Sequence, residues 1–120
     1  MKTTLATLLL LLPMFSAAAP SAETTREITH LLSHLETSGC QFYRNGSWYS
    51  AAQAREHLNG KYKYLLDKGK ISNAESFIEL AATQSSMSGK HYQVKCGNEA
   101  SQESAVWLGA ELQHFRKEAK

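Results

Sequence analysis

A stretch of small polar residues with a single cation carries the side chains best suited to chemistry. It spans residues 85–90, Ser-Ser-Met-Ser-Gly-Lys, and an alternating, strand-like segment follows at residues 91–96. Hydroxyl groups, backbone amides and one ammonium group in a concave turn would suit a carboxylate or a phosphate. The same composition is typical of a turn that only leads into a strand. The sequence leaves both interpretations open.

The serines beside His91 raise the question of nucleophilic catalysis, which we do not expect. A serine nucleophile needs an adjacent base and a third group that orients this base. The chain lacks the Gly-x-Ser-x-Gly turn of hydrolases, and the Ser-x-x-Lys pattern of penicillin-recognising enzymes fails because Met87 stands at its serine position. A Walker loop is also excluded, because Ser88-Gly89-Lys90 lacks the upstream glycine. We therefore predict no catalytic residues.

Two histidines have a spacing that can serve metal binding. His30 and His34 are four residues apart on a predicted helix, and two imidazoles at this distance can share a zinc ion. On a helical projection they lie far from the apolar stripe of Leu31, Leu32 and Leu35, so we expect them on the water-facing side. The His-Glu-x-x-His pattern is absent. We predict a solvated pair, no metal site and no cofactor.

The chain has two cysteines, Cys40 and Cys96, far apart in the sequence. In an oxidising compartment such a pair is typical of one structural disulfide, whereas a zinc site needs four ligands at short spacing. We predict that Cys40 and Cys96 are bonded.

The charge balance separates classes of partner. Lys and Arg number 13 and Asp and Glu 11, which argues against a protein that coats nucleic acid. One region departs from this balance: between residues 55 and 70, five cations face only two carboxylates. This region is either a solvated helix face or a dock for an anionic glycan or lipid.

The first residues have the pattern of a secretory signal peptide. Lys2 precedes an apolar block at residues 5–12, and small residues follow at positions 16–19. The block is too short to span a bilayer, which needs about 20 residues. We predict a leader at residues 1–22, with cleavage after Ala18 or Ala22, and a single globular domain at residues 23–120. The mature protein would then lie in the periplasm without a transmembrane anchor.

Periodicity predicts an α+β fold in the order α-β-β-α-α-β-α. Two extended runs flank Asn45-Gly46, the strongest short-range hairpin signal, and a two-residue turn there pairs Arg44 with Ser47. Because each cysteine adjoins a strand, their bond would hold the later strand beside the first strand of the hairpin. The sequence thus predicts a small three-stranded antiparallel sheet packed with about four helices. The expected helix stripes are Ile28, Leu31, Leu32 and Leu35; Ala51, Ala54, Leu58, Tyr62 and Leu65; Ala74, Phe77, Ile78 and Ala81; and Ala105, Leu108, Leu112 and Phe115.

Local signals set the ends of these helices. Ser50 with Gln53, and Ser72 with Glu75, fit capping boxes for the second and third helices. Gly60 lies inside the second helix, and we expect a close packing contact or a kink there.

Four motifs occur in a fixed order. They are Phe42-x-Arg44-Asn45-Gly46, His57-Leu58-x-x-Lys61, Ser72-x-Ala74-Glu75-x-Phe77-Ile78 and Ser85-Ser86-x-Ser88-Gly89-Lys90-x-Tyr92-x-Val94. Together, over roughly residues 28–115, they resemble the YfeK-like family of small exported bacterial proteins. This resemblance implies an exported protein and covers nearly all of the predicted mature chain. It supplies no activity and no catalytic residues, because the family is a domain of unknown function.

These observations favour a periplasmic, non-enzymatic binding or envelope-associated module that recognises an anionic group or a partner protein. Arginine and lysine would pair with the anion while loop amides orient it. The candidate binding residues are Arg44, Asn45, Lys61, Ser86, Ser88, Gly89, Lys90 and Tyr92.

Two alternatives remain. Ser88-Gly89-x-x-Tyr92 is similar to the loop by which periplasmic lysozyme inhibitors plug their target's cleft, so the chain could inhibit a lysozyme or another hydrolase. A small envelope enzyme is the second alternative.

The outward face of the hairpin, with Tyr43 and Trp48 paired across it, would form an amphipathic platform. This platform would be open to a partner only if no helix covers it.

Overall fold

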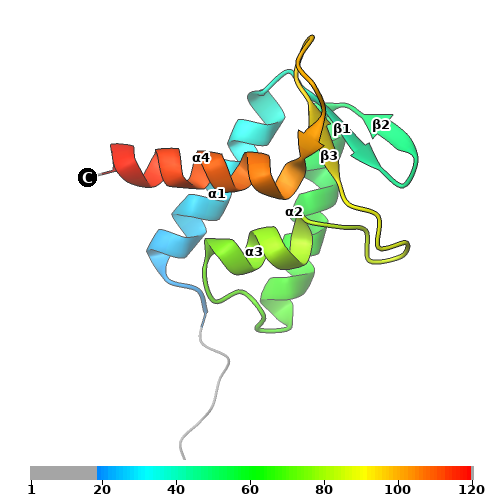
Figure 1. The fold of residues 1–120 in the computed structure, drawn as a ribbon. Coiled ribbons are helices and arrows are strands. Elements are labelled where there is room, and N and C mark those ends of the chain that lie inside the picture. Colours follow the sequence, from blue (N-terminus) through cyan, green and yellow to red (C-terminus); the bar gives the residue numbers. More distant parts are fainter. Residues whose placement is uncertain (1–18, 120) are drawn as a thin grey trace, which may run out of the picture.

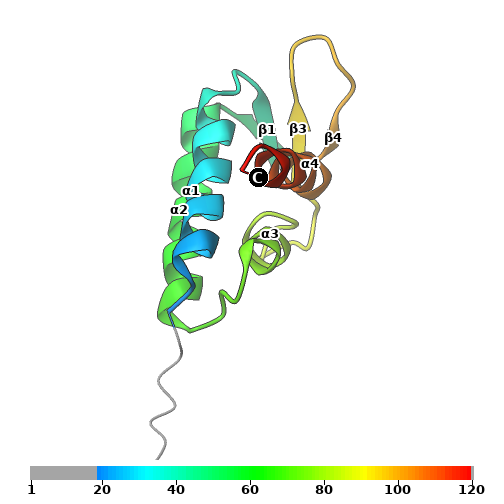
Figure 2. The ribbon, with the colours of Figure 1, turned by 90° about the vertical axis from the view of Figure 1, so that its left-hand side faces the viewer.

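Helices α1 (Ala22–Thr37) and α2 (Ala51–Asp67) lie side by side, and α3 (Ala74–Ala81) and α4 (Ser104–Glu118) run across them (Figures 1 and 2). The computed structural model describes residues 19–119. Residues 1–18, which hold most of the predicted leader, lie outside the described residues. Within the described part, no helix is long and apolar enough to cross a membrane.

One small antiparallel sheet lies at one end of the helices (Figure 1). Its strands are β1 (Gln41–Arg44), β2 (Ser47–Tyr49), β3 (Gln93–Lys95) and β4 (Gln102–Glu103), in the order β2-β1-β3-β4. The α+β class and the placement of β3 beside β1 are confirmed, but the sheet has four strands and not three. The missed strand, β4, consists of two exposed polar residues, so no alternation of apolar side chains could reveal it.

The hairpin follows the predicted register. Phe42 pairs with Tyr49, Tyr43 with Trp48, and Arg44 with Ser47. Both turn residues have positive φ, 50° at Asn45 and 88° at Gly46. A two-residue turn requires this backbone conformation, which asparagine and glycine tolerate best.

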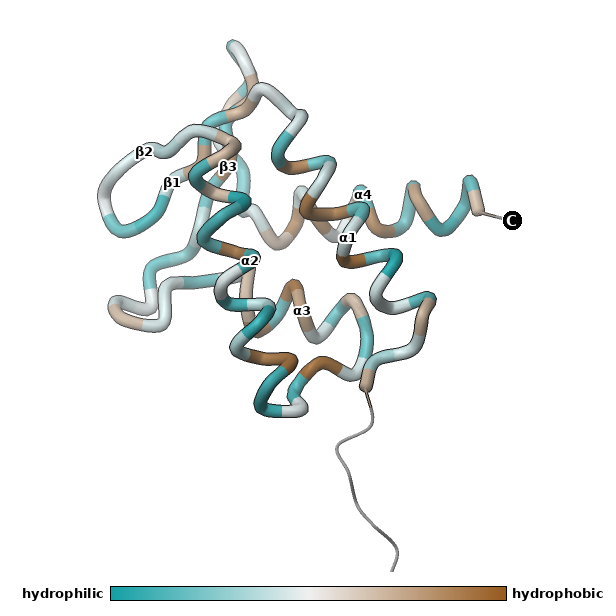
Figure 3. Tube along the Cα trace, turned by 180° about the vertical axis from the view of Figure 1, so that it is seen from behind, coloured by the Kyte–Doolittle hydropathy of each residue, from teal (hydrophilic) through white to brown (hydrophobic). Residues whose placement is uncertain are grey.

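The core lies between the two helix pairs and the inner face of the sheet. Apolar residues alternate with polar ones along α2 and α3 (Figure 3), as expected for helices with one buried face. All predicted apolar residues of α1 and α3 are buried, and so are Leu58, Tyr62, Leu65, Leu108 and Leu112. Phe42, Tyr92 and Val94 extend the core from the sheet.

The predicted disulfide is present and joins Cys40 to Cys96. Cys40 directly precedes β1 and Cys96 directly follows β3, so the bond lies at one end of the pairing between these two strands.

The start of α3 corrects one prediction. The capping residue is Asn73 and not Ser72: its side chain accepts a hydrogen bond from the backbone N–H of Ser76 at 2.8 Å, and Ser76 Oγ accepts one from the backbone N–H of Asn73. Asparagine caps helices at least as well as serine, so the sequence pattern fitted both starts. Glu75 takes no part in the cap and instead forms an ion pair with Arg116 of α4.

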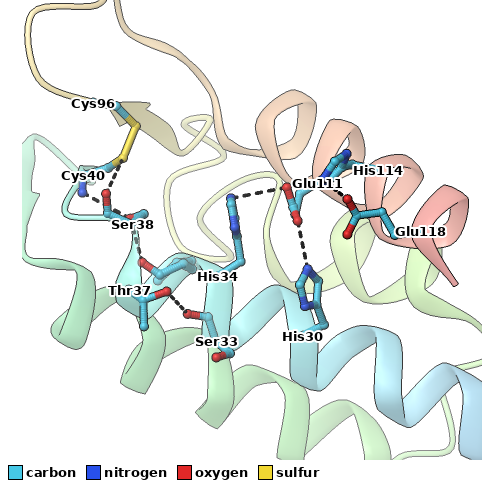
Figure 4. Close-up of polar contacts among 11 residues, drawn as sticks. His30, Ser33, His34, Thr37, Ser38, Cys40, Cys96, Glu111, His114 and Glu118 are labelled. Atoms are coloured by element: carbon cyan, nitrogen blue, oxygen red, sulfur yellow. Dashed lines mark hydrogen bonds and ion pairs between the residues drawn. A yellow bond between two sulfur atoms is a disulfide. The ribbon is translucent and has the colours of Figure 1, made fainter.

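The water-facing position predicted for His30 and His34 is only partly correct, because α4 packs on that side of α1 and leaves their side chains 32 % and 33 % exposed. Figure 4 shows both imidazoles directed at Glu111, with Nε2 atoms 2.9 Å and 3.7 Å from its carboxylate oxygens. His30 also stacks on Phe115 with ring centroids 4.1 Å apart, and His34 leans on Trp107. Between residues 19 and 119, no group of three His, Cys, Asp or Glu side chains is arranged to hold a metal ion.

The close packing contact predicted at Gly60 is absent. A Cβ atom built on Gly60 would meet nothing within 4 Å, and α2 continues through this position as far as Asp67. The capping box of Ser50 and Gln53 at the start of α2 is confirmed.

We therefore expect Gly60→Ala to stabilise the protein. Glycine in a helix interior loses more backbone entropy on folding than alanine, so the free energy of unfolding should rise by up to about 1 kcal/mol. Urea unfolding followed by circular dichroism measures the change. Ala110→Gly, at an exposed position in the interior of α4, is the reciprocal control and should lower stability by a similar amount. A destabilised Gly60→Ala protein would mean that the glycine serves packing after all.

Candidate anion-binding site

Four polar side chains from three segments converge beside the sheet. Arg44 is the last residue of β1, His57 and Lys61 lie on α2, and Tyr92 directly precedes β3. His57 and Lys61 are four residues apart, so they project from the same face of the helix. We call Arg44, His57, Lys61 and Tyr92 the cationic cluster.

The hydrogen bonds in the cationic cluster determine where its protons lie. Arg44 Nη1 is 3.3 Å from His57 Nδ1, and because a guanidinium only donates, Nδ1 must be the acceptor. The neutral imidazole then carries its proton on Nε2 and donates to Tyr92 Oη at 3.2 Å. Lys61 Nζ donates to the same phenol oxygen at 3.2 Å.

This arrangement leaves the cluster rich in donors and poor in acceptors. Tyr92 Oη receives two hydrogen bonds, so its own proton points away from both donors and finds no acceptor among the described residues. Lys61 has one further partner, the backbone carbonyl of Gln84 at 3.3 Å. Arg44 lies over the ring of Tyr49, with its Cζ atom 4.5 Å from the centroid.

The positive charge of the cluster is not neutralised by a neighbouring acid. Among residues 19–119, neither Arg44 nor Lys61 forms an ion pair with a carboxylate. Burial, followed by the charges of Arg44 and Lys61, lowers the pKa of His57. Burial and then Arg44 lower the pKa of Lys61, and burial raises the pKa of Tyr92, an effect that Arg44 opposes. Burial disfavours the charged form of each of the three groups, and the neighbouring cations further disfavour protonation of His57 and Lys61. A bound anion would offset the repulsion between these positive charges.

The serine-rich loop is tied to the hairpin and does not enter the cluster as a whole. Ser85 is buried, and its Oγ accepts hydrogen bonds from the backbone N–H groups of Met87 and Ser88. Ser88 Oγ donates to Asn45 Oδ1 at 2.5 Å, which links the loop to the hairpin turn. Ser86 lines an open groove together with His57 and Lys61.

The predicted site residues therefore divide into two groups. Arg44, Lys61 and Tyr92 come together, and Ser86 borders them. Asn45 and Ser88 bind each other and fix the loop, whereas Gly89 and Lys90 are exposed beyond it. Gly89 has a φ of 72°, the left-handed conformation that a glycine adopts without strain.

Sequence reasoning missed His57 as a member of the site. The signal was available, because His57 precedes Lys61 by one helical turn in the motif His57-Leu58-x-x-Lys61. Two polar residues at this spacing share one helix face. Arg44, at the end of β1, contacts that face of α2 through His57.

The fold of residues 19–119 is thus of the α+β class, with four helices and a four-stranded sheet. Beside that sheet lie two cations, Arg44 and Lys61, that form no ion pair with a carboxylate of this part of the chain. The model of the family of unknown function DUF5329 matches residues 22–116, and the chain belongs to this family. No curated protein and no solved structure is significantly similar to the chain.

Proposed function

We propose that this protein is an exported, non-catalytic binding module of the bacterial envelope that recognises an anionic group at the cationic cluster. One observation carries the proposal: within the described residues, Arg44 and Lys61 converge on Tyr92 and His57 without a carboxylate partner. Hydrogen bonds from charged donors to an anion are the strong kind, and an incoming anion would also relieve the repulsion between the two cations.

Export is proposed from the leader pattern and from the resemblance to the YfeK-like family, and the disulfide is compatible with it. Of the two proposed cleavage positions, only Ala18 leaves Ser21 in the mature chain. Ser21 Oγ accepts a hydrogen bond from the backbone N–H of Thr24 at 3.1 Å and so caps α1. The ligand would then be a component of the envelope, such as an anionic glycan, a lipid headgroup, a small acid or an acidic group of a partner protein.

Titration with sodium phosphate, followed by NMR, tests the proposed binding. We expect saturable shifts at Arg44, His57 and Tyr92 that sodium chloride of equal ionic strength does not reproduce. Arg44→Gln and Lys61→Gln each remove a charged hydrogen-bond donor, so each should weaken binding at least about tenfold.

The chain offers matched controls for both substitutions. Arg26→Gln and Lys63→Gln remove the same charges from exposed positions on α1 and α2 and should leave the affinity unchanged. Shifts that chloride reproduces, or equal losses in the control variants, would show only general electrostatic attraction and would refute a specific site.

Inhibition of a lysozyme or another hydrolase stays a prediction that no observation favours. In the Ser88-Gly89-x-x-Tyr92 pattern, Tyr92 is 6 % exposed and its hydroxyl faces the cluster, so it is not presented to a partner's cleft. The alternative of a small envelope enzyme also stays a prediction.

A further inference from the structure

A narrow apolar slot opens beside the cationic cluster. Its lining comes from α1, α2, β1, β2, the end of α3 and the start of α4, so it reaches from the surface into the middle of the core. The slot holds a cavity of about 30 Å³. This is more than the roughly 10–15 Å³ that a single water molecule needs, so the cavity has room for a short, narrow chain.

The lining of the slot has a polar part and an apolar part. Arg44, His57 and Tyr92 border it on the side of the cluster. Leu35, Phe42, Leu58 and Ala82 form the buried part, and all four are 6 % exposed or less. An anion held by Arg44 would therefore stand at the edge of an apolar space that leads away from it.

The buried part contains one unpaired hydroxyl. Ser104 lines the slot and is 3 % exposed, and its Oγ has no hydrogen-bond partner among the described residues. Buried polar atoms without a partner are rare in folded proteins, and each needs an explanation, such as a bound water or ion. A guest that carries an oxygen atom would satisfy this group.

We propose that the slot and the cationic cluster together bind a short-chain organic acid. Its carboxylate lies on Arg44, its aliphatic part fills the space between Phe42, Leu58 and Ala82, and a hydroxyl or carbonyl oxygen on its chain meets Ser104. This inference rests on the proposed function, because it assigns the anion that the cluster recognises. It adds the class of ligand, which a cluster of cations alone does not define.

A chain-length series tests the use of the slot. The wild-type protein is titrated with acetate, propionate and butyrate at equal ionic strength, and the dissociation constants are obtained by NMR. Each buried methylene group should tighten binding about fourfold, until the slot is full. Inorganic phosphate is the reference anion, because it can occupy the cluster but has no chain for the slot.

Blocking the slot should abolish this dependence. Ala54 lines the slot, whereas Ala52 of the same helix is exposed. Ala54→Leu should therefore make the three acids bind with equal affinity while phosphate binding stays unchanged, and Ala52→Leu should preserve the series. Thermal unfolding checks that both variants fold, and Ala54→Val, which adds less volume, replaces a leucine variant that does not.

The hydroxyl of Ser104 is tested with 3-hydroxybutyrate, using both enantiomers. One of them should bind the wild-type protein about fivefold more tightly than butyrate, the effect of one additional hydrogen bond. Ser104→Ala should remove this advantage and leave the affinity for butyrate at least as high.

The possible outcomes separate this inference from the proposed function. If phosphate binds at the cluster but acetate and butyrate bind equally, the slot assignment is wrong and the proposed function stands. If no anion binds specifically, both are wrong. If neither enantiomer of 3-hydroxybutyrate gains over butyrate, the assigned contact with Ser104 is refuted.

Discussion

Replacing Cys40 and Cys96 together by serine should lower the free energy of unfolding by about 4 kcal/mol. The two residues are 56 positions apart, and their bond therefore restricts a large part of the unfolded chain. In the chain-entropy account, a closed loop of this length removes many unfolded conformations, which raises the free energy of the unfolded state. The loss is a large fraction of the roughly 5–15 kcal/mol that stabilises an ordinary domain.

Equilibrium unfolding in urea measures this effect, with the oxidised wild type as the reference. The wild type in the presence of a reductant is the matched control, because it breaks the bond without changing either side chain. Both samples without the bond should unfold at similar, lower urea concentrations. A loss below about 1 kcal/mol would contradict the predicted restriction of the unfolded chain.

Arg116→Ala should lower the free energy of unfolding by about 3 kcal/mol. Arg116 on α4 binds the carboxylate of Glu27 on α1 through two nitrogen atoms, Nε at 2.7 Å and Nη2 at 3.1 Å. Glu27 is 5 % exposed, so the substitution leaves a buried carboxylate without its cation. Breaking such a pair usually costs about 3–5 kcal/mol, and the partial exposure of Arg116 places this pair at the lower end.

A double-mutant cycle isolates this ion pair. Glu27→Gln, Arg116→Ala and the double variant are unfolded in urea, and the double variant should be more stable than the sum of the single changes predicts, because neither charge then remains unpaired. Lys117→Ala is the control, since Lys117 is exposed on the same turn of α4. Equal effects of Arg116→Ala and Lys117→Ala would contradict a specific role for the pair.

Arg116 should also make the free energy of unfolding depend on pH. Arg116 also binds Glu75 at the start of α3, and this hydrogen bond is the main reason that the pKa of Glu75 is lowered. A carboxyl group with a lower pKa in the folded state contributes stability that is complete above its unfolded pKa, about 4.3. This contribution is lost as the pH falls through the lower, folded value, and Arg116→Ala should therefore flatten the acid side of the stability profile.

Much of the fold could be predicted because its signals are local. The turn at Asn45-Gly46 determines the hairpin register without any tertiary information, and the structure has the predicted pairs. The disulfide followed from the number and spacing of the cysteines. These features depend on neighbours in the sequence or on simple counting.

The errors arise where tertiary contacts decide between options that look equal in the sequence. The helical projection places His30 and His34 away from the apolar stripe of α1, but only the packing of α4 determines that Glu111 and Phe115 lie against that side. Similarly, Ser72 and Asn73 both fit the start of a helix. The cationic cluster was found only in part, because the contact of Arg44 with His57 joins a strand to a helix.

The lengths of the outermost strands bear on how the protein behaves at high concentration. The two edge strands of the sheet are short: β2 has three residues and β4 has two. The last residue of β4, Glu103, carries an exposed carboxylate. A long, flat edge strand offers unpaired backbone N–H and C=O groups with which a strand of another molecule can pair. Short or charged edge strands make this pairing unfavourable. The short edge strands and the charge of Glu103 therefore disfavour edge-to-edge aggregation through this sheet.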